Sequence, residues 1–487
     1  MATQQHVLMS DKAIWQLSVS ELSERLTSGS LTATALLDSL LSRIDEFNPA
    51  LNAFVAMNPQ VRIEAEESEQ RLLQGRGRSP LEGIPVAIKD NINVRGMVTS
   101  WGSHAFAGGP AAMFDELPVA RLRAAGMVIL GKTNVPEFTL DGYTDNPVYG
   151  VTRNPWNTDL TPGGSSGGAV AAVAAGLAPC AVGTDGGGSI RRPASHTGLI
   201  GLKPSIGRIA RHHGLPHIML DFEVAGLITR TVNDAQLLYS VVAGPDARDR
   251  NSLLAEEPEL EPELDPVQKL QTALRILYVR RFGDHPLDSE IAASVDQAAA
   301  RLRSLGHEVT EGQLPFSLDF VDAFWPMLGR VAVGALFEQY PEAEQLASSK
   351  WQTMAQSGRQ ISAPRYLAAI DGIDQFRRIV TEAYQDFDII MTPSAAALPW
   401  PAEQPYPEVI DGQAVGPRGH AIYTGWVNAC GHPGLNLPSA CSASGLPIGF
   451  QLIGRFGNDR QLLRLGEAYE SVLPDGWTRV PVDPRPA

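Results

Sequence analysis

The stretch 162–193 constrains this chain most, because in it glycine surrounds two serines. It contains the runs Pro-Gly-Gly-Ser-Ser-Gly-Gly at 162–168 and Gly-Thr-Asp-Gly-Gly-Gly-Ser-Ile-Arg at 183–191. Glycine lets a backbone pass close to a ligand, and successive free N–H groups form an anion-binding nest. Ser165 and Ser189, 24 positions apart (189 − 165), therefore each place a hydroxyl beside oxyanion donors, as acyl transfer requires. The plainer alternative is a glycine-rich turn with capping hydroxyls.

Serine is a weak nucleophile without a base, and Lys89 is the candidate base. No histidine adjoins either serine in a known arrangement, and the G-x-S-x-G elbow of α/β-hydrolases is absent. The apolar run Ile84–Ile88 predicts a buried strand, with Lys89 at its carboxyl end. Burial disfavours the charged form of an amine, so a lysine there can act as a neutral base near pH 7.

These runs resemble the motifs of the amidase signature family. The resemblance covers 83–91 (Gly-Ile-Pro-Val-Ala-Ile-Lys-Asp-Asn), 162–168 and 183–193, and it continues at 201–208 and in the Gly-Phe-Gln-Leu-Ile-Gly run at 449–454. The separated motifs occur in the family's order and spacing, which makes the resemblance specific.

The resemblance implies a Ser–cisSer–Lys triad, in which Ser189 is the nucleophile, Ser165 relays its proton on a cis peptide bond, and Lys89 is the terminal base. It implies an oxyanion hole made by the backbone N–H groups of Gly186, Gly187, Gly188 and Ser189. It also implies four supporting residues around the triad: Ser166, Thr184, Asp185 and Arg191.

A turn-rich loop at 132–156 resembles the family segment that lines the acyl pocket. The match makes five residues candidates for substrate contact: Thr139, Leu140, Asp141 and Tyr143, with Gly164 beside the first serine. A carboxylate at Asp141 would select a polar or cationic group. The alternative for Tyr143 is a packed surface aromatic.

Strands and helices alternate through the core, which predicts an α/β fold with a largely parallel or mixed sheet. We expect strands at 84–88, 127–130 and 180–183, and helices at 119–125 and 168–177. The resemblance implies a single large domain whose central mixed β-sheet has helices on both faces.

The predicted domain, 1–487, has four parts: a helical N-terminal cover (1–80), the signature core (81–250), a variable substrate-pocket region (251–400) and a C-terminal part that completes the sheet (401–487). In the cover, Thr32 caps a helix that we expect Asn48-Pro49 to end. A Glu/Pro-rich connector at 256–265 is expected to be exposed, and the Pro/Gly-rich segment 400–417 is a candidate lid.

Net charge and cysteine content limit the kinds of partner and location that this chain can have. The 487 residues carry a formal charge of −15 without a dense Lys/Arg run, which argues against a nucleic-acid partner. Three cysteines suit a reducing, cytoplasmic location. No secretory signal is visible, and the longest apolar run, 169–182, is too short to span a bilayer. We expect a small-molecule amide substrate, no membrane, no cofactor and, from the resemblance, a homodimer.

Histidines cluster at 212–213, but no His-x₃-His or cysteine partner accompanies them, so no metal site is expected. Cys180 lies in an apolar strand, where a buried thiol is usually inert rather than a nucleophile.

The favoured interpretation is hydrolysis of a carboxylic amide C–N bond through an acyl-enzyme, releasing acid and ammonia or amine. One rival is the glutaminase (A) subunit of a tRNA-dependent amidotransferase, which shares this core. Such subunits usually carry other residues where this chain has Gly186 and Arg192, and 218–223 departs from their pattern. A non-enzymatic binding protein on the same fold is the second rival, although it would be expected to lose triad residues. Which amide is cleaved stays open.

Overall fold

A mixed sheet of eleven strands runs through the computed structural model, which describes residues 12–216, 218–254, 273–474 and 484. Its strand order is β1-β3-β2-β4-β6-β5-β12-β13-β9-β7-β8. The strands are β1 (Phe54–Met57), β2 (Pro85–Lys89), β3 (Val128–Thr133), β4 (Ala181–Asp185), β5 (Ile200–Lys203), β6 (Val224–Thr229), β7 (Arg275–Tyr278), β8 (Glu308–Glu311), β9 (Ile389–Pro393), β12 (Gly434–Cys441) and β13 (Pro447–Gly454).

Strand direction changes along this sheet. β2 pairs in parallel with β3 and β4, and β7 pairs in parallel with β8 and β9. The pairs between β4 and β9 are antiparallel, as is β1 with β3. The predicted mixed sheet is therefore confirmed.

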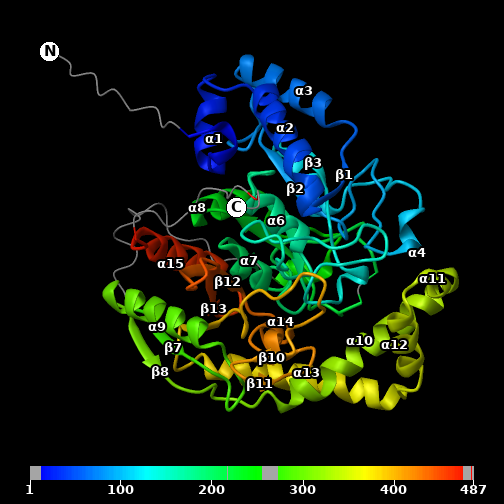
Figure 1. The fold of residues 1–487 in the computed structure, drawn as a ribbon, viewed down its shortest axis with the longest axis vertical. Coiled ribbons are helices and arrows are strands. Elements are labelled where there is room, and N and C mark those ends of the chain that lie inside the picture. Colours follow the sequence, from blue (N-terminus) through cyan, green and yellow to red (C-terminus); the bar gives the residue numbers. More distant parts are fainter. Residues whose placement is uncertain (1–11, 217, 255–272, 475–483, 485–487) are drawn as a thin grey trace.

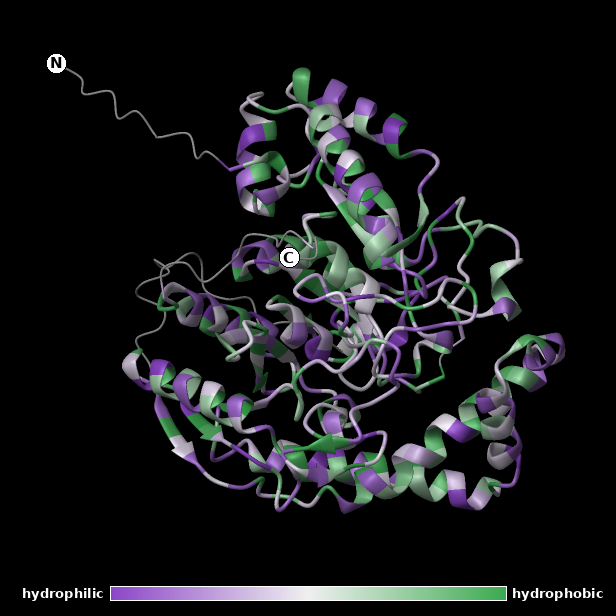
Figure 2. Cartoon of the chain, in the orientation of Figure 1, coloured by the Kyte–Doolittle hydropathy of each residue, from purple (hydrophilic) through white to green (hydrophobic). Residues whose placement is uncertain are grey.

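Helices surround the sheet (Figure 1). They are α1 (Val19–Thr27), α2 (Ala33–Leu51), α3 (Val61–Leu73), α4 (His104–Ala107), α5 (Leu117–Ala124), α6 (Gly167–Ala174), α7 (Arg191–Thr197), α8 (Val232–Val242), α9 (Ser289–Ser304), α10 (Asp319–Gln339), α11 (Pro341–Leu346), α12 (Ser349–Arg359), α13 (Ala363–Ala383), α14 (Gly425–Cys430) and α15 (Asp459–Ser471). Figure 2 shows green and purple turns alternating along many of them, as expected of helices with one buried face.

Alternate residues of β2 enter different apolar cores. Val86 and Ile88 join the core that contains α5 and α8 side chains, whereas Ala87 joins the core formed by α2 and α6. Successive side chains of a strand point to opposite faces, so helices cover both faces of the sheet, as predicted.

Helices α10 to α13 form an arm, drawn in yellow and yellow-green, that extends from the sheet and returns toward α4 (Figure 1). By length and composition alone α10 could cross a membrane, but 56% of its apolar window is buried. It packs on α12, as a core helix does.

The expected end of the first long helix was wrong. Helix α2 continues through Pro49 to Leu51 and ends at Asn52, whose left-handed backbone conformation is typical of a helix C-terminus. Near the C-terminal end of the sheet, a 3₁₀ turn at Gly419–Ala421 comes shortly before helix α14.

The segment 400–417 contains the hairpin of β10 (Val409–Ile410) and β11 (Gln413–Ala414). The predicted connector 256–265 lies outside the described residues. Because 251–400 also supplies β7, β8 and β9, this region contributes sheet strands as well as the arm. The four-part division of the chain stays a prediction.

Candidate active site

Lys89 ends β2 and is fully buried. Its Nζ donates to Ser165 Oγ at 2.8 Å, to Thr184 Oγ1 at 2.9 Å and to Thr184 O at 3.0 Å. Thr184 lies on β4, the parallel neighbour of β2, so sheet pairing brings these groups together. Burial lowers the pKa of Lys89 to about 7, although Glu223 and Asp185 act to raise it.

Ser165 precedes α6, and the Gly164–Ser165 peptide bond is cis. A Cβ on Gly164 would lie 2.6 Å from Tyr143 O, so only glycine allows the backbone of the 132–156 loop to pack here. The Ser165 side chain is buried, and its contact with Lys89 is the shortest of the three that the amine makes.

Ser189 lies in the loop between β4 and α7, and 7% of its surface is exposed. Ser166 N donates to Ser189 O at 3.1 Å, and Ser166 Oγ donates to Thr184 O at 3.2 Å. These hydrogen bonds join the two glycine-rich runs and place Ser189 beside Ser166, the residue after Ser165.

Asp185 organises the loop that carries Ser189. Its carboxylate accepts from Gly188 N at 2.7 Å, from Ile190 N at 3.0 Å and from Arg191 Nε at 3.1 Å. Burial acts to raise the pKa of Asp185, but the Arg191 guanidinium outweighs it and holds that pKa well below its usual range. The carboxylate thus stays charged and fixes the loop.

The Gly188 amide differs from the expected role. It already donates to Asp185, so it is not a free oxyanion donor in this structure. Within the described residues, no protein acceptor is found for the amides of Gly186, Gly187 and Ser189.

Arg191 braces this loop against the C-terminal part of the chain. It donates to Gln451 Oε1 on β13 at 2.8 Å and to Asn428 Oδ1 on α14 at 2.6 Å. Asn428 also donates to Asp185 O at 2.8 Å. Sequence reasoning did not single out Asn428 or Gln451, although Gln451 belongs to the recognised 449–454 run.

Aromatic and cationic side chains lie against the same loop. A Cβ on Gly187 would lie 2.8 Å from the Trp325 ring of α10, and Trp325 stacks on Phe222 at 5.9 Å. Arg192 is buried and donates to Gly187 O and, at 2.9 Å, to Thr424 Oγ1. Trp325 lies in the 251–400 region predicted to shape the substrate pocket, but it was not singled out, because only the tertiary fold brings α10 to this loop.

The predicted substrate residues have varied surroundings. Thr139 Oγ1 is already bonded, accepting from Trp101 Nε1 at 3.2 Å and donating to Phe138 O at 2.6 Å. Asp141 pairs with Lys350 of α12 at 2.5 Å. Its charge is thus already matched within the protein.

Leu140 and Tyr143 are partly buried, and burial raises the pKa of Tyr143 to about 12. Their substrate contacts, like that of Gly164, stay predictions.

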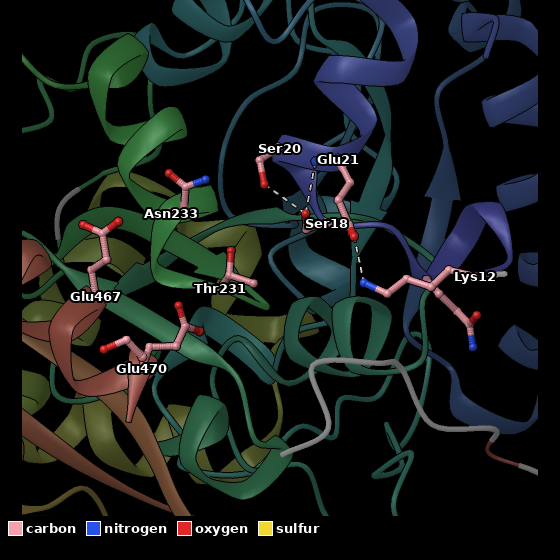
Figure 3. A pocket seen from close by; sticks show the side chains of 10 residues that line it. Lys12, Ser18, Ser20, Glu21, Thr231, Asn233, Glu467 and Glu470 are labelled. Atoms are coloured by element: carbon pink, nitrogen blue, oxygen red, sulfur yellow. Dashed lines mark hydrogen bonds and ion pairs between the residues drawn. The ribbon is translucent and has the colours of Figure 1, made fainter. Parts of the chain in front are cut away.

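A separate surface pocket of about 470 Å³ lies where α1, α8 and α15 meet (Figure 3). It is lined by polar groups that include Lys12, Glu21 and Glu470, and none of the predicted site residues lines it. The Lys12–Glu21 ion pair and the Ser18 cap of α1 account for much of one wall.

Nothing in the described part of the chain groups three His, Cys, Asp or Glu side chains around a possible metal. Cys180 is buried, and burial raises the pKa of its thiol.

A model of the amidase family matches residues 35–463. Among curated proteins, the glutamyl-tRNA(Gln) amidotransferase (A) subunit of Synechococcus sp. (strain CC9605) is 33% identical over 93% of this chain and 96% of its own. A protein of the same name from Symbiobacterium thermophilum is 34% identical, and the match covers 94% of this chain and 96% of that protein.

Solved structures are similar over nearly the whole fold. A bacterial aryl acylamidase of the amidase signature family superposes with a TM-score of 0.86, at 28% identity, over 97% of this chain and 99% of its own. A 6-aminohexanoate cyclic dimer hydrolase superposes with a TM-score of 0.85 at 28% identity, and the match covers 96% of this chain and 99% of the hydrolase.

These relatives correct the expected partners. We expected a homodimer acting alone on a small-molecule amide, with no nucleic-acid partner. The curated relatives are subunits of an enzyme named for a tRNA substrate, which overturns that expectation and favours the rival interpretation over a lone amidase. Family match, relatives and superposition agree on the chemistry, so this chain belongs to the amidase signature family and is a hydrolase of amide C–N bonds.

Proposed function

We propose that the chain hydrolyses its amide through an acyl-enzyme on Ser189, with Ser165 as proton relay and Lys89 as terminal base. The observation that carries the proposal is the 2.8 Å contact between Lys89 Nζ and Ser165 Oγ in a buried site. A neutral amine with a pKa of about 7 has a lone pair that accepts the Ser165 proton along this contact.

The reaction has two halves. Ser189 Oγ attacks the amide carbonyl as its proton passes to Ser165 Oγ and the Ser165 proton passes to Lys89. The tetrahedral intermediate collapses, its C–N bond breaks, and the protonated relay delivers a proton to the leaving nitrogen. Water then attacks the acyl-enzyme by the same route, releases the acid and restores Ser189.

The oxyanion of both intermediates is assigned to the amides of Gly186, Gly187 and Ser189. Gly188 is left out because its N–H bonds Asp185. Each donor lost from such a site costs on the order of 3 kcal/mol of transition-state stabilisation.

For the substrate, we propose the side-chain amide of glutamine, with this chain serving as the glutaminase (A) subunit of an amidotransferase that uses a tRNA-linked acceptor. The support is the identity of 33–34%, over 93–94% of this chain, to curated proteins of that name. Because the family's glutaminase subunits usually differ at Gly186 and Arg192, a direct assay of glutamine hydrolysis is decisive.

The test compares ammonia release from L-glutamine with hydrolysis of a simple acyl anilide, using wild-type protein and Ser189→Ala. A tagged chain purified from its native cells is examined for co-purifying subunits and tRNA. Glutamine hydrolysis that needs Ser189 supports the full proposal. Anilide hydrolysis with neither glutaminase activity nor a co-purifying protein contradicts the substrate proposal alone, and activity retained by Ser189→Ala contradicts the mechanism.

A further inference from the structure

A chain of polar contacts leads from Lys89 to two charged residues on the 211–223 segment. Thr184 Oγ1, which accepts from Lys89 Nζ at 2.9 Å, also accepts from Asn91 Nδ2 at 2.9 Å. Asn91 Nδ2 in turn donates to Glu223 Oε1 at 3.1 Å. The carboxylate of Glu223 is therefore linked to the amine through two buried side chains.

Glu223 is held in place by Arg211. Arg211 Nη1 donates to Glu223 Oε1 at 3.0 Å, and its Nε donates to Glu116 Oε1 at 2.5 Å. A Cβ on Gly186 would lie 3.5 Å from Glu223 Cβ, so the pair lies directly against the loop that carries Ser189. Glu116 and Arg211 are 0% and 10% exposed, and Glu223 is 15% exposed. Solvent thus screens these charges little.

Among the described residues, charged groups of both signs act on Lys89. Glu223 and Asp185 favour its protonated form, and Arg211 and Arg192 favour its neutral form. The Asp185 charge is matched by Arg191 in a fully buried ion pair at 3.0 Å, and Arg192 is bonded to Gly187 O and Thr424. Glu223 and Arg211, by contrast, pair with each other at 3.0 Å, and their charges act on Lys89 in opposite directions.

We propose that Glu223 and Arg211 are positioning residues. Their opposite charges act on Lys89, to which Asn91 and Thr184 link them by hydrogen bonds, and together they set the pH at which Lys89 becomes a base. The proposal rests on the proposed function, because it takes Lys89 to be the base that activates Ser189. Neither residue touches the reacting atoms. Their role is to balance each other so that the amine is neutral in the range where the reaction runs.

The test measures the rate at which a fluorophosphonate labels Ser189 as a function of pH, which needs no knowledge of the substrate. Glu223→Gln keeps an acceptor oxygen for Asn91 and Arg211 but removes the charge. With that charge gone, the neutral amine is favoured and the acid limb moves to lower pH by about 0.5–1 unit.

The opposite shift is expected from the double variant Arg211→Gln/Glu116→Gln. The double variant removes the Arg211 cation and the charge of its buried partner Glu116, so no unpaired charge is left at Glu116. The charge of Glu223 then has no opposite charge beside it. The acid limb then moves to higher pH by a similar amount. Glu344→Gln, which breaks an exposed pair with Arg359, is the control and leaves the limb where it is.

Opposite shifts with comparable thermal melting support the proposal, since a merely structural role would lower the rate without moving the limb in two directions. The proposal is overturned if the acid limbs of both variants coincide with that of the wild type, or if both limbs move in the same direction. If the double variant does not fold, Glu223→Gln alone decides. Absence of Ser189 labelling in wild type would instead contradict the acyl-enzyme mechanism, and the inference falls with it.

Discussion

Lys89 Nζ and Ser165 Oγ lie 2.8 Å apart although 76 positions separate the two residues in the chain. One residue ends a central strand and the other precedes a helix that packs on the same sheet. Both side chains are buried, so the contact between the amine and the hydroxyl is shielded from water.

Replacing Ser189 by alanine removes the proposed nucleophile. We expect amide hydrolysis to fall by a factor on the order of 10⁴ or more, because only binding and oxyanion stabilisation remain. The measurement is kcat on glutamine or an acyl anilide, whichever the wild type hydrolyses, together with loss of fluorophosphonate labelling. Ser304→Ala, at an exposed helix end, is the matched control and should retain wild-type rates. Labelling that persists in Ser189→Ala would assign the nucleophile elsewhere.

The rate should rise with pH through an acid limb centred near pH 7. Burial lowers the pKa of Lys89 to about 7, and only the neutral amine can accept a proton, so activity is lost as the pH falls through that value. A profile of kcat/KM between about pH 5 and 9 checks this in the free enzyme. A rate that is flat across this range, in a protein that stays folded, would exclude Lys89 as the base.

Asp185→Asn should both destabilise the protein and abolish activity. The substitution leaves the buried Arg191 guanidinium without its counter-charge, which costs about 3–5 kcal/mol of unfolding free energy. Denaturant titration measures the loss. Glu344→Gln breaks an exposed pair and should change stability by less than about 1 kcal/mol. Equal losses of unfolding free energy in the two variants would mean that the buried Asp185–Arg191 pair stabilises the protein no more than an exposed pair does.

A methyl group on Gly187 should obstruct the site. The new Cβ would lie 2.8 Å from the Trp325 ring, so the loop or α10 must shift, and we expect kcat to fall about tenfold or more. Trp325→Phe in the same chain makes space and should restore part of the rate. Gly108→Ala, where nothing lies within 4 Å, is the control. A double variant no better than Gly187→Ala would show that Trp325 is not the obstacle.

Breaking the Asp141–Lys350 pair tests whether Asp141 recognises substrate. If the carboxylate serves only to join the pocket loop to α12, Asp141→Asn and Lys350→Met should have the same small effect, within about 1 kcal/mol of stability, and similar KM values. A KM that rises only in Asp141→Asn, and only for cationic substrates, would restore the role expected from the sequence.

The sequence by itself determined the class of fold and indicated which residues are candidates for the chemistry. Lys89, Ser165 and Ser189 were identified because glycine-rich runs and a strand-end lysine are local features with a direct chemical meaning. The alternation of strands and helices around them predicted a largely parallel or mixed sheet, and the family resemblance implied helices on both of its faces. Short elements such as β1 and β5, with four residues each, carry too little pattern to be recognised before their pairing partners are known.

Only the tertiary structure decided what surrounds those residues. Whether Gly188 could serve as an oxyanion donor depended on where the Asp185 carboxylate points, and the hydrogen bond between them answers it. Trp325 and Glu223 reach the Ser189 loop from distant parts of the sequence, which no local pattern encodes. The physical reason is that proton affinity, free donors and pocket walls are set by burial and by neighbours in space, whereas a sequence motif records only neighbours along the chain.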